Sequence, residues 1–310
     1  MSEPTSASYY GDPILHRPVW TAEIPWYFFT GGLAGASSAL AVAARAGARP
    51  DLARLWEGTA AAGALVSPLL LVSDLGQPSR FLNMLRVFKP TSPMSMGSWL
   101  LATYAPAAIG AAVLDQLDRL SLRSLGGLTG GVAREVPRGV ARGVAGLTGP
   151  GLATYTAVLI ADTAVPVWHE GRHELPFVFA GSALASAGGA AVALAAPGDA
   201  APGRRALALG AALELGAAQV MEHRLGVLGD AYRQAPARSY RRGARALTVA
   251  GAALALTAGR TRRPWAVLGG VMTMAGSVCE RFSVFRAGFV SADDPAATVA
   301  PQRRGLNASS

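Results

Sequence analysis

The sequence contains few cysteines, few histidines and few charged residues. The first two shortages limit the metal sites that the chain can form, and the third argues against a soluble protein. Its 310 residues include one cysteine, Cys279, and four histidines. A single thiol forms no disulfide within the chain, and an iron–sulfur cluster needs about four thiolates. Charged residues make up 15% of the chain, whereas an average soluble domain has about 25%. We therefore expect no iron–sulfur cluster in this chain and a surface that mostly does not face water.

Apolar residues are abundant and are gathered into long runs. The chain is 51% hydrophobic, with a mean hydropathy of +0.31, and the runs carry almost no charge, which is typical of membrane-spanning helices. The sequence predicts an all-α, polytopic integral membrane bundle of about eight transmembrane helices, at 25–44, 55–72, 98–114, 151–166, 175–196, 206–221, 244–259 and 265–284. The predicted division is a polar N-terminal segment (1–24), the transmembrane bundle (25–284) and a flexible C-terminal tail (285–310).

Eight spans place both termini on one side of the membrane, which we call face A. The connections 73–97, 167–174 and 222–243 lie on that side, and the other four lie on face B. The Arg-rich segment 115–148 is predicted to be an extramembrane loop, because its many glycines argue against a long helix. The net charge of +9 sits mainly at the ends of the apolar runs. This placement favours contact with anionic lipid headgroups over nucleic acid.

The histidines, which a membrane haem would need as ligands, all fall outside the predicted spans. A b-type haem in a membrane requires histidines that face each other within the bilayer, so we expect no haem. In the predicted topology the four lie at face A: His16, His169, His173 and His223. Any one of them is readily explained as a solvated residue at headgroup level. Their shared placement favours a site on this face.

Asp162 and Glu214 are the acids inside predicted spans that we consider as candidates for chemistry. Asp162 lies one turn from the face A end of the fourth span, and Glu214 lies near the middle of the sixth. A carboxylate in the bilayer costs about 3 kcal/mol, so it needs a partner or a function. Asp162 has a structural alternative, because an acid at a helix end can reach water or pair with an arginine. The functional hypothesis is proton exchange beside a quinone ring, or a step in a proton path.

The connection between the second and third spans is the most distinctive segment of the chain. It reads DLGQPSRFLNMLRVFKPTSPMSMGSW over residues 74–99 and combines an acid, two proline turns and several cations. Together with IPWYFFTGGLAGASSAL at 24–40 and ELGAAQVMEHRLG at 214–226, it makes the chain resemble the NrfD/PsrC family. The members of this family are integral membrane subunits of quinone-linked molybdoenzymes such as polysulfide reductase.

The resemblance implies a quinone-interacting subunit of a multi-subunit oxidoreductase in the plasma membrane of a bacterium. Such a subunit has no redox centre of its own. It binds menaquinone or ubiquinone near one face and docks a four-cluster, ferredoxin-like iron–sulfur subunit that connects to a molybdopterin catalytic subunit. The resemblance assigns pocket structure or docking to Asp74 and Arg80, and contact with the quinone or proton exchange to Tyr27, Asp162 and His169. Glu214 would belong to a proton path.

Two other functions stay open at this point. A secondary transporter also places acids in the middle of the membrane, but it usually contains inverted repeats, and no convincing pair of repeats is present here. A purely structural anchor would tether an enzyme without touching quinone. Asp162 and Glu214 argue against an anchor of that kind.

Overall fold

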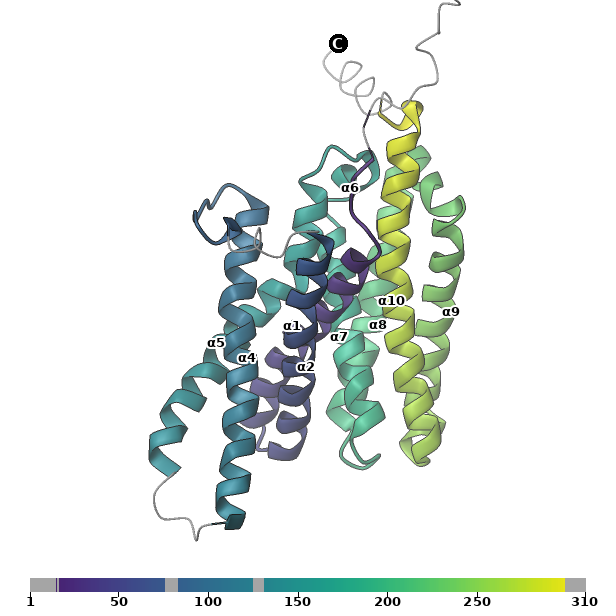
Figure 1. Cartoon of the computed structure of the whole chain (residues 1–310). Coiled ribbons are helices and arrows are strands. Elements are labelled where there is room, and N and C mark those ends of the chain that lie inside the picture. The colour runs from purple at the N-terminus through teal and green to yellow at the C-terminus, as the bar shows by residue number, and fades with distance from the viewer. Residues whose placement is uncertain (1–14, 16, 76–82, 125–130, 299–310) are drawn as a thin grey trace, which may run out of the picture.

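The computed structural model describes residues 15, 17–75, 83–124 and 131–298, and these residues are helical almost throughout. Eight long helices lie side by side in the described chain (Figure 1). They are α1 (Glu23–Ala46), α2 (Pro50–Asp74), α4 (Pro93–Ser124), α5 (Gly131–Ala161), α7 (Leu175–Leu194), α8 (Ala201–Leu225), α9 (Ala237–Leu256) and α10 (Arg263–Asp293). The shorter elements are α6 (Pro166–Glu170) and the 3₁₀ helices η1 (Gly226–Arg233) and η2 (Ala258–Arg260). The predicted all-helical fold is confirmed.

Five of these helices are long and apolar enough to cross a membrane. They are α1, α2, residues 93–120 of α4, residues 135–161 of α5, and α7. The remaining long helices, α8, α9 and α10, have 25, 20 and 31 residues and carry more charged side chains. A polytopic membrane protein is therefore confirmed. The count of eight spans and the side on which the termini lie stay predictions.

The helices pack in two groups. In the first group α1 contacts α2 and α5, and α4 contacts α2 and α5. In the second group α7 packs on α8 and α10, and α10 packs on α9. Contacts of α7 with α1 and α5 join the groups, so α7 lies near the centre of the bundle in Figure 1. Nearly all of its length is buried.

Glycines set the closest approaches between helices. A Cβ atom added at Gly35 of α1 would lie 2.2 Å from the backbone oxygen of Gly149 in α5. One added at Gly181 of α7 would lie 2.4 Å from the backbone nitrogen of Glu214 in α8. Both distances are far inside van der Waals contact. The backbones meet directly at these points, as small residues allow in membrane bundles.

The segment 115–148 differs from its prediction. It is not an extended loop, because α4 continues to Ser124 and α5 begins at Gly131. Ion pairs between the two helices account for the difference: Arg142 lies 3.0 Å from Asp115, and Arg138 pairs with Asp118. These pairs offset the low helix propensity of the glycines. Residues 125–130 lie outside the described part of the chain.

Other predicted boundaries also move. Residues 285–293 belong to α10, so the predicted start of the tail at 285 is wrong, and residues 299–310 lie outside the description. The predicted basic loop 222–243 is largely helical, since it contains the end of α8, all of η1 and the start of α9. The fourth span was predicted to reach 166, but α5 ends at Ala161. Pro166 explains this early end, because the residue before a proline disfavours helical geometry.

We predict that Gly35→Ala destabilises the protein by about 2 kcal/mol, since the new methyl group would force α1 away from α5. Thermal unfolding in a mild detergent measures the effect. Gly110→Ala is the matched control, because nothing lies within 4 Å of a Cβ atom at that position. The control should be neutral or more stable, since alanine favours helix over glycine by about 1 kcal/mol. Equal melting temperatures for the two variants would contradict the proposed backbone contact.

Candidate functional site

A hollow at the junction of α5 and α6 brings together two of the residues predicted from the sequence. Its volume is about 490 Å³, within the range of about 300–1,000 Å³ that is usual for small-molecule sites. Asp162 and His169 both line it. The full lining is Leu15, Asp162, Thr163, Ala164, Pro166, His169, Glu170 and Thr298. The hollow therefore combines two carboxylates, Asp162 and Glu170, and an imidazole with apolar walls.

The short helix α6 is fixed by Trp168, and this position orients the neighbouring His169. The Trp168 indole fits against Gly288 of α10, where an added Cβ atom would lie 2.0 Å from the ring. Its Nε1 donates a hydrogen bond of 2.8 Å to the carbonyl of Val284, and its ring stacks on Trp20 at 5.7 Å. A buried tryptophan held in this way leaves α6 little freedom to move relative to α10.

His169 has one ring nitrogen engaged by the backbone. Its Nδ1 lies 3.2 Å from the carbonyl oxygen of Ala161. Because a carbonyl oxygen only accepts, the hydrogen bond requires the proton on Nδ1 and leaves Nε2 as an acceptor. The side chain is exposed. It is therefore placed to take a proton from a group in the hollow.

Asp162 lies outside the helix in which it was predicted. It follows Ala161, the last residue of α5, and its side chain is exposed. The prediction that Asp162 lies within a helix is wrong, because the chain leaves the helix in the turn that follows Ala161. Its position relative to the membrane stays a prediction.

The other predicted residues lie elsewhere. Tyr27 is 2% exposed and belongs to the core around α1. Asp74 accepts hydrogen bonds from the backbone nitrogen (3.0 Å) and the hydroxyl (2.5 Å) of Thr21, so it ties the end of α2 to the segment before α1. Neither residue lines the hollow. Arg80 lies outside the described residues.

Gly97, near the end of the 74–99 connection, takes part in the packing of α4 against α5. A Cβ atom at Gly97 would lie 1.8 Å from Cζ of Tyr155 in α5. The absence of a side chain at Gly97 makes room for the phenol ring of Tyr155. The glycine near the end of the motif therefore sets the distance between α4 and α5.

Glu214 is buried in the second helix group, together with two charged residues that the sequence analysis missed. It is 1% exposed, and neither of its carboxylate oxygens has a hydrogen-bond partner within the described chain. Glu280 and Arg281 of α10 interact with it electrostatically, and they are 6% and 1% exposed. The signal in the sequence was an adjacent pair of opposite charges within the apolar run 265–284.

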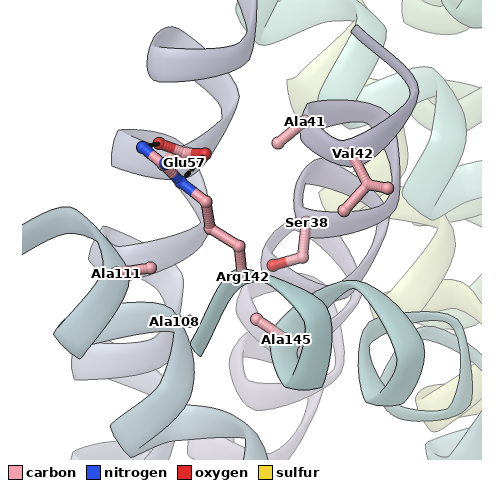
Figure 2. A pocket seen from close by; sticks show the side chains of 8 residues that line it. All are labelled: Ser38, Ala41, Val42, Glu57, Ala108, Ala111, Arg142 and Ala145. Atoms are coloured by element: carbon pink, nitrogen blue, oxygen red, sulfur yellow. Dashed lines mark hydrogen bonds and ion pairs between the residues drawn. The ribbon is translucent and has the colours of Figure 1, made fainter. Parts of the chain in front are cut away.

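A second missed group lies at the opposite end of the bundle, on α1, α2, α4 and α5. Figure 2 shows Glu57 facing Arg142 beside a small cavity. Glu57 also accepts a hydrogen bond of 2.6 Å from Arg45, and Arg142 reaches Glu57 at 2.8 Å and Asp115 at 3.0 Å. The cavity measures about 10 Å³, enough for no more than about one water molecule. This network balances its charges, which favours a structural role.

Acids also lie at the end of the bundle opposite α6. Glu57, Asp115 and Asp118 lie at the end of the bundle opposite α6, each in an ion pair with arginine. The sequence did not indicate this group, because Glu57 falls inside an apolar run and the other two acids fall in the segment predicted to be a loop. Each of the three is paired with an arginine of another helix: Arg45, Arg138 or Arg142.

Comparison with known families decides the identity of the bundle. Residues 14–202 match the family model for polysulphide reductase, NrfD, which covers more than half of the 310 residues. The chain belongs to the NrfD family. No curated protein matches it. Members of the NrfD family are membrane subunits of polysulfide reductase-like complexes, and the five apolar helices agree with an integral membrane protein. The matched range includes Asp162 and His169, which line the hollow. Glu214 lies outside the matched range.

We predict that Glu57→Gln lowers the stability of the bundle by about 3 kcal/mol, since it leaves the Arg45 and Arg142 guanidinium groups without their shared carboxylate. Denaturant or thermal unfolding in detergent checks this value. Asp51→Asn is the matched control: its side chain is 89% exposed in its pair with Arg54, so its loss should cost less than about 1 kcal/mol. A Glu57→Gln protein as stable as the control would show that the network contributes nothing.

Proposed function

We propose that this NrfD-family chain is the quinone-reactive membrane subunit of a multi-subunit oxidoreductase. In this role it passes electrons between the quinone pool and an iron–sulfur partner subunit. The observation that carries the proposal is the hollow at the α5–α6 junction, where Asp162 and His169 line one cavity. The wider family supplies the class of reaction.

The hollow fits the head of a quinone in both size and chemistry. Leu15, Ala164 and Pro166 offer apolar wall, and His169 and Asp162 offer polar atoms. Reduction of a quinone consumes two protons with two electrons, and oxidation of the quinol releases them. Exposed Asp162 exchanges protons with water, and Nε2 of His169 accepts one from a quinol hydroxyl. These two side chains therefore carry the proton part of the reaction.

The electrons require a partner, because one cysteine cannot bind an iron–sulfur cluster. The partner we propose is a ferredoxin-like subunit with four clusters, joined to a molybdopterin catalytic subunit. The described part of the 74–99 connection gives it a docking surface. Val87 and Phe88 are 64% and 57% exposed, between the exposed cations Arg86 and Lys89. An apolar centre with a charged rim is typical of a protein interface.

We expect the complex to be isolated intact from its native membrane in mild detergent. Mass spectrometry should find an iron–sulfur subunit and a molybdopterin subunit with this chain, and an organic extract should contain menaquinone or ubiquinone. A chain that purifies alone and without quinone would contradict the proposal and would favour a transporter. Stable partners without any quinone would favour a purely structural anchor.

Substitutions in the hollow test its role directly. Asp162→Asn and His169→Gln should each leave the complex assembled and slow quinone turnover at least about tenfold, because each removes a proton-exchanging group. Turnover is measured with an artificial electron donor and a soluble quinone analogue. The controls are Asp230→Asn and His173→Gln, which alter exposed residues that do not line the hollow. Wild-type turnover in both hollow variants would place the quinone site elsewhere.

A further inference from the structure

A surface rich in arginine lies on the second helix group, at the end of the bundle opposite α6. Two helix connections form it: the turn from α7 to α8 and the turn from α9 to α10, which both lie at the lower end of the bundle in Figure 1. The two turns are far apart in the sequence. We call this surface the arginine patch, and its residues are Arg204, Arg205, Arg260, Arg262 and Arg263.

Hydrogen bonds bring arginines from two different helices onto one connection. Arg263, the first residue of α10, donates to the carbonyl oxygens of Ala195 and Leu194, the latter at 3.1 Å. Arg204, in the first turn of α8, donates a hydrogen bond of 2.8 Å to the carbonyl oxygen of Pro197. A carbonyl oxygen orients a guanidinium group but has no full negative charge. These bonds therefore fix the geometry of the patch and leave its positive charge unbalanced.

The two helix groups differ in charge balance at this end of the bundle. In the first group, arginines face carboxylates: Arg45 lies 2.6 Å from Glu57, and Arg142 lies 3.0 Å from Asp115. Within the described residues, no arginine of the patch forms an ion pair. Asp199, the acid of the turn from α7 to α8, is exposed and forms none there either. The unbalanced positive charge at this end is therefore concentrated on the second group.

The charges of the patch lie close enough to repel each other. Burial, and after it the charge of Arg260, lowers the pKa of Arg204. The side chains of Arg205, Arg260 and Arg262 are exposed, and their guanidinium groups make no hydrogen bond in the part of the chain that the structure describes. Like charges gathered without counter-charges attract an anion. Their free N–H groups can donate paired hydrogen bonds to phosphate oxygens.

The surface that adjoins the patch is apolar. Leu194 at the end of α7, and Trp265 and Leu268 in the first turns of α10, are 63%, 41% and 44% exposed. A tryptophan between cationic and apolar surface is typical of the headgroup level of a membrane. A phospholipid fits both parts, because its phosphate can bind the guanidinium groups while its acyl chains lie along the leucines. A free phosphate ion would leave the apolar part uncovered.

We propose that the arginine patch binds the phosphate of an anionic phospholipid, which bridges the turn from α7 to α8 and the turn from α9 to α10. The bound lipid neutralises the repulsion between the two turns and thereby stabilises the packing of α10 on α7. The site lies at the end of the bundle opposite the hollow at the α5–α6 junction, so it is separate from the proposed quinone chemistry.

Thermal unfolding of the purified full-length chain in mild detergent tests the lipid site. Phosphatidylglycerol, phosphatidylcholine and inorganic phosphate are compared at equal phosphate concentration. We expect phosphatidylglycerol to raise the melting temperature by at least about 3 °C more than either of the others. An equal shift with phosphatidylcholine would show that apolar contact suffices, and an equal shift with inorganic phosphate would show a site for free anions. Either result, or no shift at all, would overturn the proposal.

Substitutions locate the lipid on the patch. Arg260→Gln combined with Arg262→Gln removes two guanidinium groups that make no hydrogen bond in the described residues, so the fold should survive. This variant should lose at least about half of the phosphatidylglycerol shift, since two of five cations are gone. Arg238→Gln combined with Arg242→Gln is the matched control. It removes the same charge from exposed residues at the other end of α9 and should keep the full shift.

Equal shifts in the patch variant and the control, whether both full or both reduced, would overturn the placement on the patch. Native mass spectrometry of the wild type gives a test that needs no variant. The chain should retain phosphatidylglycerol at collision energies that remove phosphatidylcholine, and equal retention of the two lipids would contradict the proposal. These measurements use neither quinone nor an electron donor, so their outcome is independent of the quinone proposal.

Discussion

Direct backbone contact at glycines is the constraint on which the rest of this structure depends. Helices in a membrane gain little from excluding water, so they are held by close packing and by the polar contacts that close packing permits. Gly35 against Gly149 sets the distance between α1 and α5, and Gly97 sets the distance from α4 to the ring of Tyr155. Gly181 lies directly against the backbone of Glu214. The close contact between α7 and α8 therefore also excludes solvent from Glu214.

Close packing makes every buried charge unfavourable unless it has a partner. The two helix groups differ in the partners of their buried charges. In the first group Glu57 and Asp115 face Arg45 and Arg142 within ion-pair distance, so the carboxylates are balanced. In the second group Arg281 is directed toward Phe179 of α7, and Glu214 has no direct partner in the described chain. A balanced network stabilises a bundle.

The hollow and the buried charges of the second helix group are separated in space. Asp162 and His169 are exposed and line the hollow at the α6 end. The cluster of Glu214, Glu280 and Arg281 lies along α8 and α10 and is closed to water. Between them Trp168 fixes α6 against α10 through Gly288 and the carbonyl of Val284. A movement of α10 would therefore displace α6, because the Trp168 indole leaves no free space between the two helices.

The sequence by itself determined the helical membrane fold, because long runs without charge have few stable alternatives in a bilayer. It also determined the family, through the 74–99 connection, and the placement of Asp162 and His169 at one end of the bundle. Tertiary structure alone decided the partners of the charges. Asp115 and Arg142 are 27 residues apart on successive helices, and their pairing accompanies two helices where a loop was predicted. Only the packing of α7, α8 and α10 brought Glu214 to Glu280 and Arg281, because periodicity along one helix does not specify which faces of separate helices meet.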